Sequence, residues 1–162
     1  MKADSPQVRV HNVSKSYVKG AETISVLRDA SFDIFAGDMI SITGKSGAGK
    51  STLFRTVSGL EAPSEGTIRF DGQDLTRLPA HRVVRQGVAH APEGKHLFTE
   101  ASVRKNLLLG AYVRRGDAAG VQESMEEGFE LFPMLRTKAG DAAGTLSGGQ
   151  QQMLSIGRAL MA

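Results

Sequence analysis

Residues 44–51 have the types and spacing of a phosphate-binding loop, because they match G-x-x-x-x-G-K-[ST] at every fixed position. Glycines let successive backbone N–H groups turn toward one anion without side-chain obstruction. The pattern places the Lys50 ammonium at the β- and γ-phosphates of a nucleotide, the Ser51 hydroxyl on Mg²⁺ and Thr52 at the α-phosphate. The predicted nucleotide ligands are Gly44, Lys45, Ser46, Gly47, Ala48, Gly49, Lys50, Ser51 and Thr52.

Two elements must position this loop. An apolar run over residues 38–43 predicts a strand before it, and Leu53, Phe54 and Val57 lie on one face of a predicted helix after it, which Gly59 ends. Such a helix directs its unpaired N-terminal N–H groups and partial positive charge at the same anion. The alternative is a glycine-rich turn that binds nothing. The strand–loop–helix context favours nucleotide binding.

Leu146-Ser147-Gly148-Gly149-Gln150 forms a second glycine-containing start of a predicted helix, whose apolar face is marked by Met153, Ile156 and Leu160. In this order, the two motifs resemble the nucleotide-binding domain of ABC transporters, in which the second motif is the family signature. The resemblance implies that the signature completes the ATP site of a partner subunit, with two ATP molecules between two head-to-tail subunits. Ser147 and the N–H groups of the two glycines then form a second anion-binding helix terminus. The residues implied to act on the partner's ATP are Leu146, Ser147, Gly148, Gly149 and Gln150.

The resemblance assigns roles to two further residues. Tyr17 lies where the family places an aromatic ring that stacks on adenine, and its alternative is a tyrosine at a strand edge. Glu93 occupies the position where most members have a glutamine that binds Mg²⁺ and senses the transmembrane partner. A carboxylate also ligates Mg²⁺, so Ser51 and Glu93 are the expected metal ligands, and the alternative for Glu93 is a solvated loop acid.

Pro92-Glu93-Gly94 is typical of one subgroup, the ATP-binding subunits of branched-chain amino-acid importers. Segments 78–82, 106–112, 131–133 and 151–161 also resemble that subgroup. The resemblance implies an ATPase with ATP and Mg²⁺ as cofactors that couples ATP binding and hydrolysis to amino-acid uptake. It also implies a second ATP-binding subunit, transmembrane permease subunits and, indirectly, a substrate-binding protein as partners. The implied location is peripheral, on the cytoplasmic face of the inner membrane.

The remaining periodicities predict strands around Val8–Val13, at residues 30–34 and 67–70, and at Val88–Ala91. Turns are expected at residues 19–22 and at Asp71-Gly72, and Pro79 opens a helix that ends at Gly87. Further helices are predicted from Ser102, with Leu107, Leu108 and Leu109, and over Val121, Met125, Phe129 and Phe132, where Pro133 stops the helix.

The expected fold is α/β, a P-loop NTPase domain of the ABC ATPase type with an N-terminal antiparallel β part, a phosphate-loop core and a helical subdomain. We expect a partial domain over 7–162, with a β and core part over 7–95, a helical subdomain over 96–150 and a returning helix over 151–162. In the family, a strand that ends in Asp-Glu and a switch histidine follow the signature helix, and no residues of this chain match them. We therefore expect the C-terminal core strands to be missing. Because the strand over 38–43 would then lack its neighbour, we expect marginal stability or aggregation of the chain alone.

Composition limits the other functions. The net charge of +3 comes without a basic stripe interleaved with aromatic residues, so nucleic acid is not an expected partner. The chain has no cysteine, no apolar run near 18 residues and no signal-peptide pattern at its start. Two other functions stay open, a nucleotide-binding fragment without turnover and an ABC ATPase that works in translation or DNA repair. A long insertion or a tandem second domain would favour the latter, and the sequence has neither.

Overall fold

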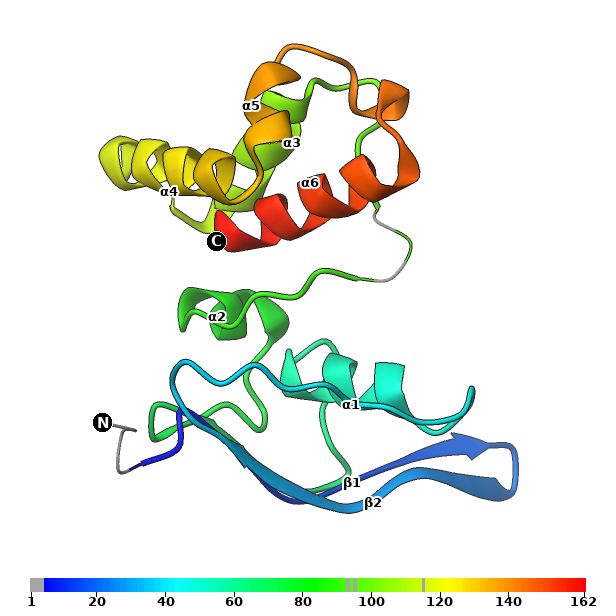
Figure 1. Ribbon diagram of the computed structural model, residues 1–162. Helices are drawn as coiled ribbons and strands as arrows, with labels where there is room; N and C mark the ends of the chain where they lie inside the picture. The colour runs from blue at the N-terminus through cyan, green and yellow to red at the C-terminus, as the bar shows by residue number, and fades with distance from the viewer. Residues whose placement is uncertain (1–4, 93, 95, 115) are drawn as a thin grey trace. The chain divides into compact units, whose positions relative to one another are not determined.

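The structure is a computed structural model that describes residues 5–92, 94, 96–114 and 116–162 (Figure 1). The chain forms two compact units, a first unit up to Gln86 and a second unit from Gly87. Each is described by itself below. The predicted boundaries at 95/96 and 150/151 stay a prediction.

The first unit contains a four-stranded antiparallel sheet in the order β2-β1-β3-β4 (Figure 1). Its strands are β1 (Val8–Lys19), β2 (Glu22–Ile34), β3 (Glu65–Phe70) and β4 (Gln73–Asp74). Three predicted strands and the antiparallel β part are thereby confirmed. The hairpin turns are confirmed as well, because Gly20 has φ 64°, and Asp71 and Gly72 both have positive φ, as tight hairpin turns require.

Residues 38–43 lie outside every helix and strand, so the predicted strand before the phosphate loop is wrong. A strand exists only where a neighbour accepts and donates its backbone hydrogen bonds, and none of the strands in the described residues pairs with this segment. The side chain of Met39 is 99% exposed. The predicted strand at Val88–Ala91 is also wrong for the same reason, since these residues pair with no described strand.

Helix α1 (Lys50–Val57) follows the loop, and α2 (Ala80–Arg85) follows Pro79, as predicted. α1 ends in a Schellman motif, in which Gly59 has φ 71° and donates to the Thr56 carbonyl, and Leu60 donates to the Arg55 carbonyl. Gly59 thus ends the helix as predicted. The buried apolar side chains of this unit come from the sheet, the segment after β4 and α2: Val10, Val13, Leu27, Ile68, Leu75 and Val83.

The second unit is helical. Its elements are α3 (Val103–Gly110), η1 (Ala111–Arg114), α4 (Ala118–Leu131), α5 (Pro133–Thr137), η2 (Ala143–Thr145) and α6 (Gly148–Leu160). Met125 and Phe129 of α4 are buried and Pro133 begins α5, which confirms the predicted helix and its end. The core of the unit joins all of these elements, and its buried members are Val103, Leu107, Ala111, Met125, Phe129, Leu135, Ala143, Leu146, Leu154 and Met161.

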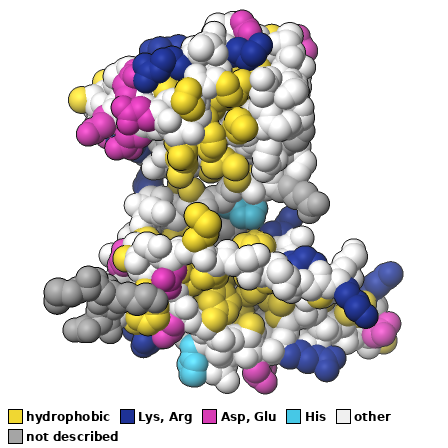
Figure 2. Space-filling view, in the orientation of Figure 1, with side chains coloured by type: hydrophobic (Ala, Val, Ile, Leu, Met, Phe, Trp, Pro, Cys, Tyr) yellow, Lys and Arg dark blue, Asp and Glu magenta, His cyan; other side chains and the backbone are white. Residues whose placement is uncertain are grey.

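The predicted final helix is confirmed as α6, but two of the three apolar residues that defined it in the sequence lie outside its buried face. Met153 and Leu160 are 38% and 50% exposed, whereas Leu154 and Gly157 are buried. The small size of Gly157 allows this orientation, because a Cβ added there would lie only 3.1 Å from the Leu107 Cδ2. The face of α6 that contains Gly157 therefore packs against α3. Hydrophobic side chains remain on the surface where α6 lies (Figure 2).

Candidate functional site

The phosphate loop spans residues 44–49 and folds around the side chain of Lys50. The Lys50 ammonium donates to the carbonyl oxygens of Gly44 at 2.7 Å and Lys45 at 2.8 Å. Gly47 and Gly49 have φ of 81° and 86°, in the left-handed region that favours glycine. An anion bound in this loop would replace these two carbonyl oxygens as the hydrogen-bond acceptor of the Lys50 ammonium.

Helix α1 begins without a side-chain cap. Its N-cap residue, Gly49, has no side chain, and a Cβ there would lie 3.0 Å from the Leu27 Cδ2 and the Val26 carbonyl oxygen. The first N–H groups of a helix have no partner within the helix. Ser51 is exposed in the first turn and Thr52 is half-buried. The start of α1 therefore presents backbone N–H groups and a hydroxyl, which suit phosphate and Mg²⁺.

Tyr17, near the end of β1, lies beside this helix. Its hydroxyl donates to Glu61, and its hydroxyl also interacts with the side chain of Thr52. The hydrogen bond with the Glu61 carboxylate raises the pKa of the Tyr17 phenol above its ordinary value, and Thr52 opposes this effect. The same hydrogen bond, followed by that from Arg55, lowers the pKa of Glu61. The fold thus brings Tyr17 next to a predicted nucleotide ligand.

The signature residues start α6 in the second unit. Ser147 is the N-cap, its hydroxyl accepts from the Gln150 N–H at 3.4 Å, and the Gln150 side chain accepts from the Ser147 N–H at 3.0 Å. This reciprocal pair is a capping box. Leu146 is buried in the core, while Gly148 and Gly149 are exposed. Ser147 and the glycines therefore form an exposed, rigid helix start.

The predicted residues divide between the units. Tyr17 and residues 44–52 belong to the first unit, and residues 146–150 belong to the second. Glu93 lies outside the described residues. Within the described ranges, no group of three or more histidine and acidic side chains could hold a metal. Mg²⁺ is commonly bound by one or two protein oxygens together with substrate phosphates, and the exposed Ser51 hydroxyl fits one such ligand.

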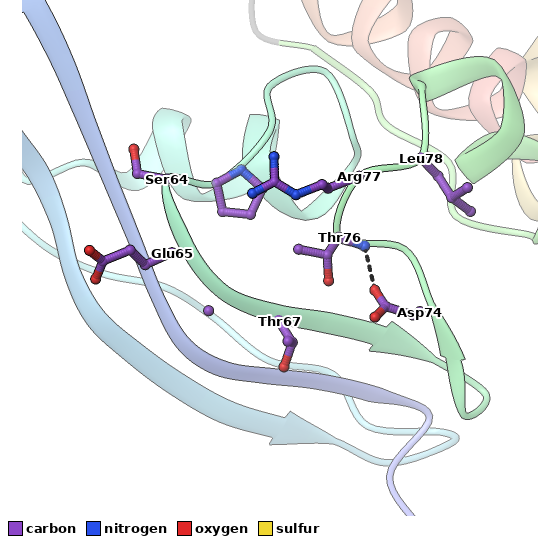
Figure 3. A pocket seen from close by; sticks show the side chains of 9 residues that line it. Ser64, Glu65, Thr67, Asp74, Thr76, Arg77 and Leu78 are labelled. Carbon is purple, nitrogen blue, oxygen red and sulfur yellow. Dashed lines mark hydrogen bonds between the residues drawn. The ribbon is translucent and has the colours of Figure 1, made fainter.

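A separate cavity of about 490 Å³ lies between β3 and the segment after β4 (Figure 3). Among its lining residues, Thr76 donates its N–H to Asp74 at 2.8 Å and accepts from the Ile68 N–H at 3.0 Å. The Thr76 side chain and its backbone N–H lower the pKa of Asp74. Among the predicted site residues that the structure describes, none lines this cavity. Its polar side chains Asp74 and Thr76 form hydrogen bonds that stabilise the hairpin of β3 and β4.

Sequence reasoning missed the residues around the Tyr17 hydroxyl. Glu61 is 44 residues away in the chain, and Arg55 on α1 and Lys15 on β1 complete the group. No local pattern links these positions. One signal was available, because Gly59 ends α1 as predicted and a chain that reverses there brings the next residues back along the helix end.

Curated relatives of the chain are ATP-binding proteins of transporters. The high-affinity branched-chain amino acid transport ATP-binding protein BraG of Pseudomonas aeruginosa is 41% identical over 85% of this chain and 58% of its own length. The probable branched-chain amino acid transport ATP-binding protein LivF of Archaeoglobus fulgidus is 33% identical over 88% and 59%. The methionine import ATP-binding protein MetN of Myxococcus xanthus is 37% identical over 94% and 47%. The chain thus spans about half to three-fifths of the length of these relatives.

Solved structures share the fold. A dimeric structure of the ATP-binding cassette MJ0796, in a post-hydrolysis state bound to ADP and Pi, matches with a TM-score of 0.80 and 28% identity over 95% of this chain and 69% of that chain. This likeness confirms the predicted α/β fold of the ABC ATPase type. None of the helices in the described ranges is long and apolar enough to cross a membrane.

The model of the family described as ABC transporter matches residues 27–162. This match includes the phosphate loop, α1 and the signature helix, and it takes in both units. By its motifs, its fold and this match, the chain belongs to the ABC transporter family, among the ATP-binding proteins.

Proposed function

We propose that this chain is the nucleotide-binding part of the ATP-binding subunit of an ABC importer. Its residues bind ATP with Mg²⁺, and the whole protein couples ATP binding and hydrolysis to amino-acid uptake through a membrane permease. The observation that carries the proposal is the phosphate loop, in which α1 begins at Lys50 without a side-chain cap and Ser51 is exposed at its first turn.

The mechanism follows from these groups. The loop and first-turn N–H groups of α1 surround the phosphates. The Lys50 ammonium leaves the carbonyl oxygens of Gly44 and Lys45 and pairs with the β- and γ-phosphates. When bound, Mg²⁺ neutralises phosphate charge, and the Ser51 hydroxyl is one of its ligands. Tyr17 would stack on the adenine ring, and a carboxylate such as that of Glu93 would supply a second oxygen ligand for Mg²⁺.

The experiment is nucleotide binding by Lys50→Ala, measured by calorimetry. Hydrogen bonds to charged groups contribute about 1.5–3 kcal/mol, so the variant should bind ATP at least about tenfold more weakly. Lys105→Ala is the control, because it removes the same charge from an exposed position on α3, outside the predicted site residues. Equal affinity of Lys50→Ala and the parent chain would remove the proposal, provided that circular dichroism finds both folded.

The signature carries the proposal of a partner subunit. Ser147, Gly148 and Gly149 present a helix start that the capping box holds in place, and a second copy or a related subunit would place a γ-phosphate there. The two subunits then enclose two ATP molecules head to tail. Ser147→Arg in the whole protein should abolish ATP-dependent dimerisation in sedimentation experiments and leave ATP binding to the monomer unchanged.

The substrate proposed is a branched-chain amino acid, and the likeness to BraG and LivF supports it. The likeness to MetN makes methionine the competing substrate. Uptake of labelled leucine and methionine into vesicles that contain the whole protein and its permease separates the two. We expect leucine uptake, and uptake of methionine alone would make methionine the proposed substrate instead.

The proposed location is the cytoplasmic face of the membrane. On the same membranes, the protein should bind to this face without spanning the bilayer, and extraction with salt or alkali tests this location.

One specific observation favours a second function, nucleotide binding without turnover. Phosphoryl transfer to water needs a group that orients the water, and no acidic residue among these 162 follows an apolar strand in the way that the family requires. Phosphate release by the purified chain tests this alternative. ATP binding without phosphate release would favour this second function.

A further inference from the structure

We propose that Glu61, held by Arg55, positions the ring of Tyr17 for stacking on the base of a bound nucleotide. This inference rests on the proposed nucleotide binding and adds a positioning residue to it. It also assigns a role to three charged side chains, Glu61, Arg55 and Lys15, that the phosphate-loop chemistry does not use.

The carboxylate of Glu61 connects the tyrosine to α1. One oxygen accepts the hydrogen bond of the Tyr17 hydroxyl, and the other accepts from the Arg55 Nε at 2.6 Å. Glu61 is half-buried, with its side chain only 19% exposed, whereas Tyr17 is 38% exposed. A partly exposed tyrosine near a hairpin turn would otherwise sample several rotamers. The two hydrogen bonds select one ring position.

The backbone of Glu61 is fixed as firmly as its side chain. The N–H groups of Leu60 and Glu61 donate to the Arg55 carbonyl at 2.9 and 3.1 Å, within the Schellman end of α1. The same helix presents its other end to the phosphates. Because α1 has 8 residues and rises about 1.5 Å per residue, its two ends are about 12 Å apart. A single rigid element therefore sets both the phosphate position and the ring position.

Lys15 restricts the ring further. Its ammonium lies 5.2 Å from the centre of the Tyr17 ring and donates to the Ala62 carbonyl at 2.6 Å. A cation over one face of an aromatic ring is attracted by the ring, and it leaves the opposite face for a planar base. Ordering the ring before the ligand arrives lowers the entropy cost of binding. This lower entropy cost strengthens the binding only of ligands that carry a base.

The binding experiment compares ATP with tripolyphosphate, which has no base, in Glu61→Ala, Tyr17→Phe and the double variant. Glu61→Ala should weaken ATP binding about five- to tenfold, close to the cost of immobilising one side chain, and leave tripolyphosphate binding unchanged. Because both substitutions break the same contact, the double variant should bind ATP as each single variant does. Glu61→Gln keeps an acceptor oxygen and should recover part of the affinity. Glu65→Gln, an exposed acid on β3, is the control and should change neither ligand.

A spectroscopic experiment tests the contact without any ligand. The chain has two tyrosines and no tryptophan, so Tyr112→Phe leaves Tyr17 as the only phenol that ionises. Its absorbance titration should give a pKa above the ordinary value of a tyrosine, and Glu61→Gln in that background should lower this pKa. The other charged groups on the ring, Lys15 and Arg55, are unchanged in that comparison.

Each outcome decides one point. Equal weakening of ATP and tripolyphosphate by Glu61→Ala would place Glu61 in the folding of the loop and overturn the inference. Unchanged ATP affinity, or an unchanged Tyr17 pKa in Glu61→Gln, would also overturn it. A parent chain that binds neither ligand would overturn the proposed function and this inference with it, whereas tripolyphosphate binding without a preference for ATP would overturn the inference alone.

Discussion

The two helices whose starts carry the sequence motifs begin in opposite ways. α6 begins with Ser147 and Gln150, whose side chains satisfy one another's backbone N–H groups. α1 begins at Gly49, which has no side chain, after a loop whose carbonyl oxygens accept from Lys50. The N-terminus of the signature helix is capped by the helix's own side chains. The phosphate-loop helix has groups suited to an anion in place of a cap.

The same contrast extends to the surroundings of each motif. In the second unit, Asn106 is hydrogen-bonded to the backbone before and at the start of α3, and Gly110 packs against the backbone of the signature helix. In the first unit, the segment before the loop forms no strand, and Met39 is almost fully exposed. We infer that changes near the signature will mainly alter stability, whereas changes in the phosphate loop will mainly alter ligand binding. Four experiments test this difference.

Asn106→Ala should have the largest effect on stability. The Asn106 side chain is fully buried and forms hydrogen bonds with both backbone groups of Phe98, at 3.0 Å each, and with the carbonyls of Ala101 and Ser102. Each buried polar group that loses its partner costs about 1–3 kcal/mol, so we expect a loss of at least about 2 kcal/mol in urea denaturation. Gln122→Ala, on the exposed side of α4, is the control and should change little. An unchanged free energy of unfolding in Asn106→Ala would contradict the view that internal hydrogen bonds stabilise the second unit.

Gly110→Ala should come next. A Cβ at Gly110 would lie 2.0 Å from the Arg158 carbonyl oxygen, which belongs to the backbone of α6 and cannot move alone. Overpacking of this kind costs about 1–3 kcal/mol. Gly128→Ala is the matched control, since nothing lies within 4 Å of its added Cβ, and alanine in a helix is favoured over glycine by about 1 kcal/mol. Opposite signs for the two variants in thermal melting would confirm the close crossing of α3 and α6.

Ser147→Ala and Ser51→Ala compare the two helix starts directly. Loss of the N-cap hydroxyl at Ser147 should lower stability by about 1 kcal/mol. Ser51 is an exposed residue inside the first turn, so its replacement should stay within about 0.5 kcal/mol and instead weaken Mg²⁺-dependent ATP binding. Equal losses of stability in both variants would erase the difference between the helix starts.

The smallest effect should be a pH dependence at Asp117, the N-cap of α4. The side-chain hydrogen bonds from Arg114, followed by that from the Gly120 N–H, lower the pKa of this carboxyl. Its contribution is therefore present above the unfolded-state pKa of about 3.9 and disappears as the pH falls through the lower folded-state pKa. Asp117→Ser keeps a capping oxygen without the charge. Its unfolding free energy should fall less steeply below pH 4 than that of the parent chain, and parallel curves would contradict the assignment.

Local patterns predicted local structure well. The paired strands, the hairpin turns, the Gly59 helix end and the Pro133 break follow from the residues themselves, because turn and cap chemistry acts over a few neighbours. The helix face of α6 could not be predicted in this way. Met153 and Leu160 share an apolar face, yet the packed face contains Gly157, because close approach to Leu107 depends on a partner helix.

The candidate site follows the same rule. The left-handed glycines and the helix start of the phosphate loop could be predicted, since one continuous segment forms them. The strand over 38–43 could not be judged from its own residues, because strand formation depends on a neighbour. Glu61 was also out of reach, since it meets Tyr17 only after β1 and the end of α1 have come together. Roles that depend on a continuous motif were accessible, and roles that depend on distant contacts were not.

α3 and the signature helix α6 cross closely, so a change in the tilt of α6 would turn it about this crossing point as a pivot. The pivot lies where Gly110 meets the Arg158 backbone, and the Arg158 side chain also donates to the His96 carbonyl at 2.9 Å. Ser147 is 11 residues away along the helix, which is about 16 Å at 1.5 Å per residue. A tilt of about 5° at the pivot would therefore move Ser147 by about 1.4 Å. A small tilt of α6 at this crossing is therefore amplified at its N-terminal end, where Ser147 lies.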